Sequence, residues 1–387
     1  MYRSPVSFRH LQRMTDDTGL LEHCLGKIPR RAEGYTTDDN ARALWACVEW
    51  WSLLESEGAK KELQDKLLEL IERYLSFLLW VQRDDGTFHN NIRFDRTPEP
   101  EQPSDDCLGR TIWSCAVAYA KLTDPDLQIA VQEMLRKAIP ATKQMMFPRG
   151  WAYALAACSL LLQHAQKSPS HAQDRFSQWV VFDLPERVGM LEEQLVDLYR
   201  QQAGEGWHWF EPAITYGNGV LPWGLFYAYS VTHRQDTLDI AKESLDFLIE
   251  KMTGNQGRIS PIGNQGWCTR EQRSNWDQQP LDVMKLALAS AQAYITLKQS
   301  EYWEIVKKCH AWFYGDNDLS IPLAETADGS CCDGLRENGA NRNRGAESTL
   351  SYLLTEAIWQ TIEWEDDVHD CRNRQQNQDS FTCVQRI

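Results

Sequence analysis

The chain contains 387 residues, 42% of them hydrophobic, and carries a formal net charge of -15. Such a chain can bury a large core, and its acidity disfavours nucleic acid as a partner because phosphate backbones repel it. No stretch approaches the roughly 18 apolar residues of a membrane helix, and residues 1–10 lack the apolar core of a signal peptide. We therefore expect a cytoplasmic protein with no membrane span.

Helical periodicity recurs along the chain in two kinds of segment. One kind is apolar almost all round, as in DDNARALWACVEWWSLLE at 38–55, which is typical of a buried helix. The other kind is amphipathic, as at 62–81, which is typical of a helix on the outside. The apolar segments begin near residues 38, 106, 150, 219, 278 and 346, and the amphipathic ones cover 62–81, 126–146, 188–202, 237–252 and 301–314.

Because the two kinds alternate, they indicate hairpins in which an inner helix is followed by an outer one. With a short run at 8–14 as the sixth outer helix, the sequence predicts an all-α fold, an (α/α)6 barrel of six hairpins. No strand pattern competes with it. We expect one barrel domain over 1–364 and a polar, disordered tail over 365–387.

The loops differ in length according to the direction of the connection. Connections from an outer to an inner helix are long, at 85–105, 203–218, 254–277 and 315–345, whereas the reverse connections are mostly short. Inner helices of such a barrel run parallel, so the long loops gather at the end where these helices begin. Long loops on a rigid scaffold are where functional sites are usually built, which predicts a cleft at that end.

Acidic doublets mark the starts of two inner helices, Asp38-Asp39 and Asp105-Asp106. A single aspartate there is readily explained as an N-cap, which typically contributes about 1 kcal/mol. Only one residue of a doublet can occupy the cap position, so the second carboxylate is available for another role. The doublets therefore favour carboxylates that face the cleft.

Paired carboxylates are the usual chemistry for cleaving a glycosidic bond, one as proton donor and one as base or nucleophile. Asp39 is our candidate for the base or nucleophile, because a helix N-terminus lowers the pKa of an aspartate. Glu211 is the candidate acid, since its sequence neighbours are aromatic and an apolar environment raises the pKa of a carboxyl group. Asp106 and Asp277 are further catalytic candidates.

The substrate-binding candidates are polar and aromatic residues of the same loops and helix starts. Arg42 and Arg110 lie one helical turn after a doublet and can equally pair with its acids. The Asn and Gln side chains of this set can equally cap helices, and its tryptophans can equally pack in the core. His23 can equally make a structural hydrogen bond. The full set is Asp38, Asn40, Arg42, His23, Asp105, Arg110, Trp207, Trp209, Asn218, Trp276, Gln278, Gln279, Asn343 and Glu347.

We expect no metal and no cofactor. The eleven cysteines are scattered, several of them in apolar helical runs, and are interpreted as reduced thiols. Cys268, Cys331 and His208 could be combined into a zinc set, but no spacing supports it. Nor does the chain contain a Gly-rich phosphate loop or a nucleotide-binding βαβ pattern.

Four strings carry a family resemblance: MTDDTGLLEH (14–23), GYTTDDNARAL (34–44), DQQPLDV (277–283) and DGLRENGANRNRGAESTLSYLL (333–354). With the six inner-helix starts, they resemble the six-hairpin glycosidase superfamily, and within it a bacterial group often found fused to family-4-type glycosyltransferases. The resemblance implies the (α/α)6 toroid, an oligosaccharide or polysaccharide substrate, and a glycosyltransferase as a candidate partner.

The resemblance also marks individual positions. One departure concerns the fourth inner helix, where this chain reads Tyr216-Gly217-Asn218-Gly219 instead of an acidic string. The loss of an aspartate there puts a role for that helix in doubt. The positions that match the group's motifs are Asp16, Asp17, His23, Asp38, Asp39, Asn40, Arg42, Asp277, Gln278, Gln279, Asn343 and Glu347.

The sequence therefore predicts a carbohydrate-active protein, with a glycoside hydrolase as the leading interpretation. The first alternative is a non-catalytic glycan-binding domain of a glycosyltransferase system. A sugar epimerase ranks lower, because that chemistry usually relies on paired histidines and only His23, His89 and His208 lie in the relevant loops. A terpene-type cyclase, suggested by Asp-Asp-Asn-Ala at 38–41, is disfavoured by the many hydrogen-bonding side chains of these loops.

Overall fold

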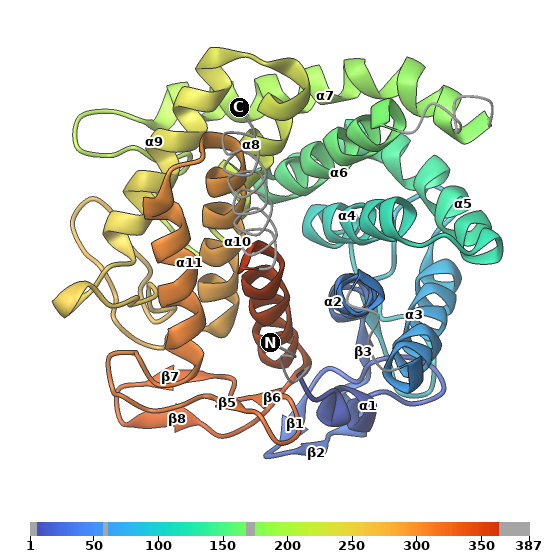
Figure 1. Ribbon diagram of the computed structural model, residues 1–387, viewed down its shortest axis with the longest axis horizontal. Coiled ribbons are helices and arrows are strands. Elements are labelled where there is room, and N and C mark those ends of the chain that lie inside the picture. The colour runs from blue at the N-terminus through green and yellow to red at the C-terminus, as the bar shows by residue number, and fades with distance from the viewer. Residues whose placement is uncertain (1–5, 57–60, 168–174, 364–387) are drawn as a thin grey trace, which may run out of the picture.

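A computed structural model describes residues 6–56, 61–167 and 175–363 of the chain (Figure 1). Across these residues, six inner helices are enclosed by six outer ones. The inner helices are α2 (Thr37–Ser56), α4 (Asp105–Lys121), α6 (Pro148–Lys167), α8 (Val220–Thr232), α10 (Pro280–Leu297) and the helix 346–363. The outer helices are α1 (Arg9–Met14), α3 (Lys61–Val81), α5 (Pro125–Ala141), α7 (Arg175–Gln202), α9 (Gln235–Lys251) and α11 (Ser300–Phe313).

Neighbouring inner helices pack side by side in chain order, and each of α3, α5, α7, α9 and α11 packs on the inner helix that precedes it. The ring closes between its first and last members, where the indole Nε1 of Trp50 on α2 donates to the carbonyl of Leu353, 2.9 Å away. The architecture is therefore the (α/α)6 toroid that the alternation of the two helix types predicted. The expected tail, 365–387, lies outside the described residues.

Helix α7 differs from its prediction, because it begins at Arg175 and not near 188. Pro185 lies inside this helix, a position where proline normally interrupts helical hydrogen bonding. Phe176, Val180 and Leu184 are nevertheless buried at four-residue spacing, in line with the rest of the helix. Burial of this stripe outweighs the local cost of the proline.

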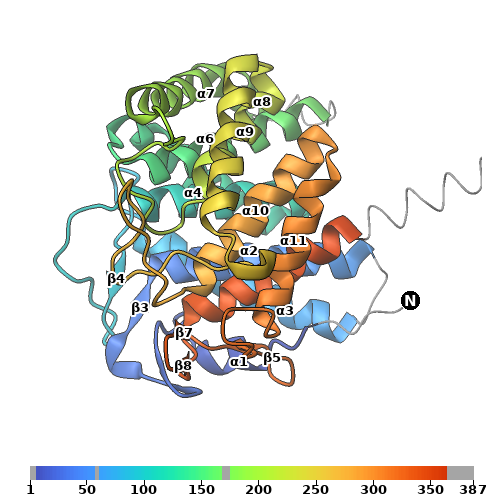
Figure 2. The ribbon, with the colours of Figure 1, turned by 90° about the vertical axis from the view of Figure 1, so that its left-hand side faces the viewer.

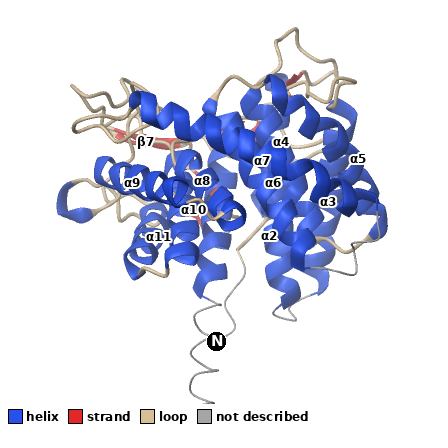
Figure 3. Ribbon diagram, turned by 90° about the horizontal axis from the view of Figure 1, so that it is seen from above, coloured by secondary structure: helices blue, strands red, loops and turns tan. Residues whose placement is uncertain are grey.

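Short strands occur within the long loops, where the sequence showed no strand pattern. They form four antiparallel pairs of two or three residues per strand, too short for a period-2 pattern to be recognised. Figure 2 places several of them at one end of the helix ring, and Figure 3 shows long loops gathered along one edge. The pairs are β1 (Cys24–Leu25) with β2 (Ile28–Pro29), β3 (Tyr35–Thr36) with β4 (Asn91–Ile92), β5 (Ala324–Glu325) with β6 (Ser330–Cys331), and β7 (Gly334–Arg336) with β8 (Gly339–Asn341).

The nine cysteines in the described part of the chain are free thiols and all are buried. Within the same residues, no group of three or more His, Cys, Asp or Glu side chains is placed to hold a metal ion, so Cys268, Cys331 and His208 do not form a zinc set. Among the helices that the structure describes, none is long and apolar enough to cross a membrane.

Glycines allow the inner helices to approach one another closely. A Cβ on Gly109 of α4 would lie 2.9 Å from the carbonyl oxygen of Gly150 on α6 and 2.9 Å from the Cβ of Tyr153. Real Cβ contacts are longer, so one of the two helices would have to move. Gly109 therefore allows α4 and α6 to pack this closely.

We expect Gly109→Ala to destabilise the protein by about 1–3 kcal/mol, since it forces extra volume between two packed helices. Gly189→Ala on the outer helix α7 is the matched control, because no atom lies within 4 Å of the added methyl group. It should stabilise by about 0.5–1 kcal/mol through helix propensity alone. Denaturant unfolding measures both, and equal effects would contradict the role given to Gly109.

Candidate active site

A cavity of about 740 Å³ opens at the end of the toroid where the inner helices begin. Side chains from the starts of α2, α4, α10 and the helix 346–363 meet there, with contributions from the long loops between them. The convergence predicted for this end is thus observed. The cavity is lined by ten of the residues singled out from the sequence: His23, Asp38, Asp39, Arg42, Asp106, Arg110, Asp277, Gln278, Gln279 and Glu347.

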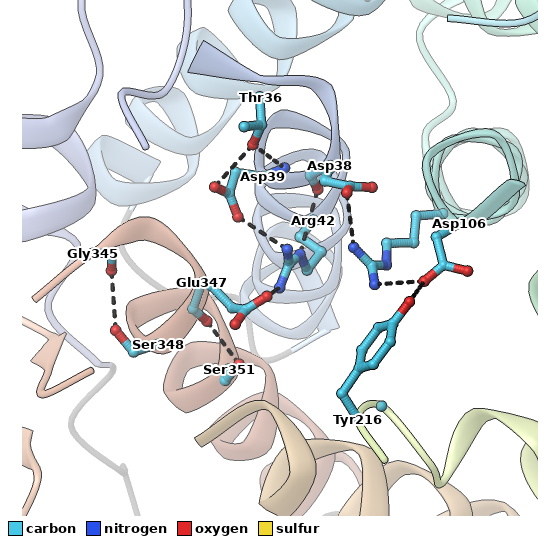
Figure 4. A network of polar contacts seen from close by, with 12 residues as sticks. Thr36, Asp38, Asp39, Arg42, Asp106, Tyr216, Gly345, Glu347, Ser348 and Ser351 are labelled. Carbon is cyan, nitrogen blue, oxygen red and sulfur yellow. Dashed lines mark hydrogen bonds and ion pairs between the residues drawn. The ribbon is translucent and has the colours of Figure 1, made fainter. Parts of the chain in front are cut away.

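Arg42 holds two carboxylates from opposite ends of the chain (Figure 4). Its Nη2 lies 3.1 Å from Oδ1 of Asp39, three residues earlier on α2. Its Nη1 donates to Oε2 of Glu347, on the last inner helix, over 2.8 Å. Thr36 also donates its hydroxyl to Oδ2 of Asp39, 3.0 Å away. The guanidinium of Arg42 therefore pairs with two carboxylates that line the cavity.

The two acids of this pair differ in exposure and in pKa. The Asp39 side chain is 6% exposed, and its burial raises its pKa to about 7, against the opposing charge of Arg42. The Glu347 side chain is 41% exposed. Its partial burial disfavours the charged form, but Arg42, Arg110 and Lys285 outweigh that effect and lower its pKa below the usual value. Near neutral pH, Glu347 is ionised while Asp39 can retain a proton.

This reverses the role expected for Asp39. The helix N-terminus suggested an ionised carboxylate, whereas burial is the dominant influence in the folded protein. The negative charge of Glu347 adds to the effect of burial, because two nearby carboxylates resist ionising together. Asp39 therefore suits a proton donor.

Arg110 organises a second pair of acids, as the spacing of the doublets suggested. Its Nη1 lies 3.0 Å from Oδ2 of Asp38, and its Nη2 lies 3.3 Å from Oδ2 of Asp106. The hydroxyl of Tyr216 donates to the same Asp106 oxygen over 2.6 Å (Figure 4). Tyr216 thus brings the loop before α8 into the site, although that loop lacks the aspartate expected there. Because Arg110 and Tyr216 both contact Oδ2 of Asp106, the orientation of this carboxylate in the cavity is fixed.

Lys285 lies buried in the core of the toroid, on α10. Its Nζ lies 5.1 Å from the ring centre of Trp45 and 4.9 Å from that of Tyr153, which is cation–π geometry. Burial lowers the pKa of Lys285 well below its usual value, and the nearby Arg110 and Arg42 lower it further. The cationic environment of Glu347 is therefore provided mainly by Arg42 and Arg110.

Glu211, predicted to be the catalytic acid, lies outside the cavity lining, so the structure does not bring it together with the other catalytic candidates. Its carboxylate lies 3.0 Å from Nη2 of Arg149, whose guanidinium also contacts Thr215 and Asn218. Asn218 is buried in this network and is not available to a substrate. The arrangement ties α6 to the loop before α8.

Trp207 and Trp209 were expected to offer ring faces to a sugar, but both are buried. Trp207 packs edge-on against Phe247 of α9, and its Nε1 donates to the carbonyl of Glu211, 2.9 Å away. Trp207 thereby attaches the loop 203–218 to α9, while Trp209 packs against Phe210 of the same loop. The structure therefore does not bring Trp207 and Trp209, predicted to bind substrate, to the cavity.

Four other candidates have structural partners and lie outside the cavity lining. Asn40 is fully buried and bonds to the backbone of Leu20 and Thr36. Asp105 accepts the backbone N–H groups of residues 146 and 147, just before α6. Asn343 accepts the N–H of residue 26, and Trp276 is half-buried beside the cavity without lining it. The structure does not place any of these four candidates in the cavity lining.

Several lining residues were not assigned to the site from the sequence. Glu22 lies 3.2 Å from Nε2 of His23 and raises the pKa of that imidazole. Asp333 accepts the hydroxyl of Ser348 over 2.6 Å. Glu22 and Asp333 occur in strings that carry the family resemblance, which was the available signal for them. Trp267 and Tyr216 lie outside those strings; for Trp267, the available signal was a tryptophan in a Gly- and Asn-rich loop.

The fold and the cavity define the class: a toroid of six helical hairpins, with a polar cleft rich in carboxylates at the start of its inner helices. This is the (α/α)6 fold that the sequence resemblance implied. No family model matches the chain, and no curated protein matches its sequence.

Solved structures share the fold at low sequence identity. Cellobiose 2-epimerase from Bacillus thermoamylovorans superposes with a TM-score of 0.67 and 10% identity, covering 92% of this chain and 96% of the epimerase. A D-mannose isomerase gives a TM-score of 0.61 and 10% identity, over 92% and 95% of the two chains. The GH76 α-mannanase from Bacteroides thetaiotaomicron gives 0.59 and 11%, over 92% and 95%. These neighbours are carbohydrate-active enzymes, and together they do not single out one reaction.

Proposed function

We propose that this protein is a glycoside hydrolase whose catalytic pair is Asp39 and Glu347. The supporting observation is the pair itself: two carboxylates on either side of Arg42, at the base of an open cavity, with their pKa values moved in opposite directions. Titratable groups whose environments separate their pKa values are the usual mark of an acid and base pair.

In this proposal, Asp39 donates a proton to the glycosidic oxygen as the bond to the leaving group breaks. Glu347, which is ionised and more exposed, either activates a water molecule or attacks the anomeric carbon. Arg42 contacts both acids and holds their relative orientation. Asp38 and Asp106, fixed by Arg110 and Tyr216, are suited to binding sugar hydroxyls at the side of the cleft.

The epimerase and isomerase neighbours make proton abstraction from the sugar the main competing chemistry. Paired histidines would supply the base and the acid for that reaction. Among the cavity-lining residues in the described part of the chain, His23 is the only histidine, and Glu22 already contacts it. The side chains present favour carboxylate chemistry, and so hydrolysis.

A screen of neutral oligosaccharides in D2O, followed by mass spectrometry, tests the proposal against its rivals. Hydrolysis gives shorter saccharides, epimerisation gives full-length product with deuterium on carbon, and a glycan-binding domain gives neither. We expect shorter products from the wild type and a loss of them in Asp39→Asn. Deuterated full-length sugar, or no product from any glycan, would reject the hydrolase.

The pH dependence of kcat/KM should be bell-shaped, with the alkaline limb near pH 7. Activity requires protonated Asp39, whose pKa is raised to about 7, so the rate falls as the pH rises through that value. It also requires ionised Glu347, whose pKa is lowered, so the acid limb lies below the usual value for a glutamate. Initial rates across pH 3–9 measure both limbs, roughly the span of these groups. An alkaline limb that is absent would contradict the role of Asp39.

A further inference from the structure

One tryptophan of the long loops does line the cavity. Trp267 belongs to the loop 252–279, between α9 and α10, and is half-buried. Its backbone has a φ of 57°, a left-handed conformation that bulky side chains rarely adopt. Such strain persists only where the surroundings enforce it, and it concentrates at functional sites.

The surroundings of Trp267 are rigid. Its N–H donates to the carbonyl of Gly263 over 3.0 Å, and its own carbonyl accepts the N–H of Ser274 over 2.7 Å. Arg273 fastens the loop to the scaffold by donating to the carbonyls of Lys251 and Ser260, at 2.8 and 2.6 Å. The backbone of Trp267 is therefore fixed before any ligand arrives.

The groups that share this part of the chain and line the same cavity are polar. Asn264 lies three residues before Trp267, with its N–H bonded to the carbonyl of Asp277, 3.0 Å away. The Asp277 carboxylate faces Arg336 of β7 across 3.7 Å, and both side chains are partly exposed. An indole ring that lines the same cavity as amide, carboxylate and guanidinium groups suits a ligand with one apolar face and a polar edge.

We propose that Trp267 is the stacking platform of a sugar subsite that takes a neutral hexopyranose. The C–H face of the sugar rests on the indole ring, and its hydroxyls meet Asn264, Asp277 and Arg336. Asp277 and the other carboxylates of the cavity repel acidic sugars, so uronic acid units are excluded. This inference rests on the proposed function, because the subsite lies in the same cleft as the proposed catalytic pair.

Trp267→Gly separates a binding role from a packing role. Glycine adopts a positive φ without strain, so the variant should unfold at the same temperature as the wild type or a higher one. If the ring binds sugar, its loss should weaken saccharide binding by about tenfold or more, because stacking area is removed. Trp80→Ala, on the outer helix α3, is the control, since Trp80 is also partly exposed and lies outside the cavity lining.

The measurements are calorimetric titration with cellotetraose, mannotetraose and tetragalacturonate, and thermal unfolding of each variant. We expect binding of at least one neutral probe, no binding of tetragalacturonate, loss of affinity in Trp267→Gly and none in Trp80→Ala. Unchanged affinity in Trp267→Gly, or a lower unfolding temperature, would overturn the platform. Binding that depends on Trp267 without turnover would retain the subsite and reject the hydrolase. Absence of any saccharide binding by the wild type would reject both.

Discussion

Replacing Glu347 with glutamine is expected to reduce turnover by about 10²- to 10⁴-fold, the range typical for removal of a general base. Glutamine has the same shape and can still accept the hydrogen bond from Arg42, so the fold should be preserved. Steady-state rates on the substrate found by the oligosaccharide screen measure the effect. Glu337→Gln is the matched control, because Glu337 is exposed beside the β7–β8 turn and lies outside the cavity lining.

The residual activity of Glu347→Gln carries a second readout. In the wild type, the negative charge of Glu347 contributes to the raised pKa of Asp39. Removing that charge lowers the pKa of Asp39, so the alkaline limb of the residual rate should move to lower pH. Wild-type turnover in Glu347→Gln would reject Glu347 as a catalytic residue. A large loss of turnover with an unmoved alkaline limb would reject the coupling between the two acids.

The toroid could be predicted from the sequence because its signal is local. Whether a helix is apolar all round or on one stripe depends on residues within a few turns of one another, and the helices observed begin within about two residues of most predicted starts. Helix α7 was the exception. A proline and a polar stretch hid its first half, whose burial depends on helices elsewhere in the ring.

The chemistry of the site was less predictable, because its main contacts join distant residues. Arg42 and Glu347 are separated by 305 positions, so no local pattern could show that they share a bond. The pKa of Asp39 likewise depends on burial and on Glu347, not on its helix position alone. The placement of the loop tryptophans could not be predicted for the same reason. The ring of Trp207 packs against Phe247, 40 positions away, and no local pattern in the sequence reveals this contact.

Arg110→Met is expected to lower the free energy of unfolding by about 3–5 kcal/mol, the usual result of removing one partner from a buried ion pair. Methionine fills much of the same space, so the loss arises mainly from charge. Without the guanidinium, Asp38 and Asp106 remain in a poorly solvated site with no cation between them; their side chains are only 17% and 14% exposed. Denaturant unfolding of the wild type and the variant measures the loss.

Arg200→Met provides the comparison, because Arg200 also lies near several acids but at the surface. Its side chain is 50% exposed and lies 2.9 Å from Asp236, an arrangement worth about 1 kcal/mol or less. A loss for Arg110→Met no larger than that for Arg200→Met would show that the Arg110 pairs add no stability. The double variant Arg110→Met, Asp106→Asn should recover part of the loss, because it removes one of the two uncompensated charges. Recovery without restored turnover would separate the structural role of Arg110 from its orientation of the acids in the cleft.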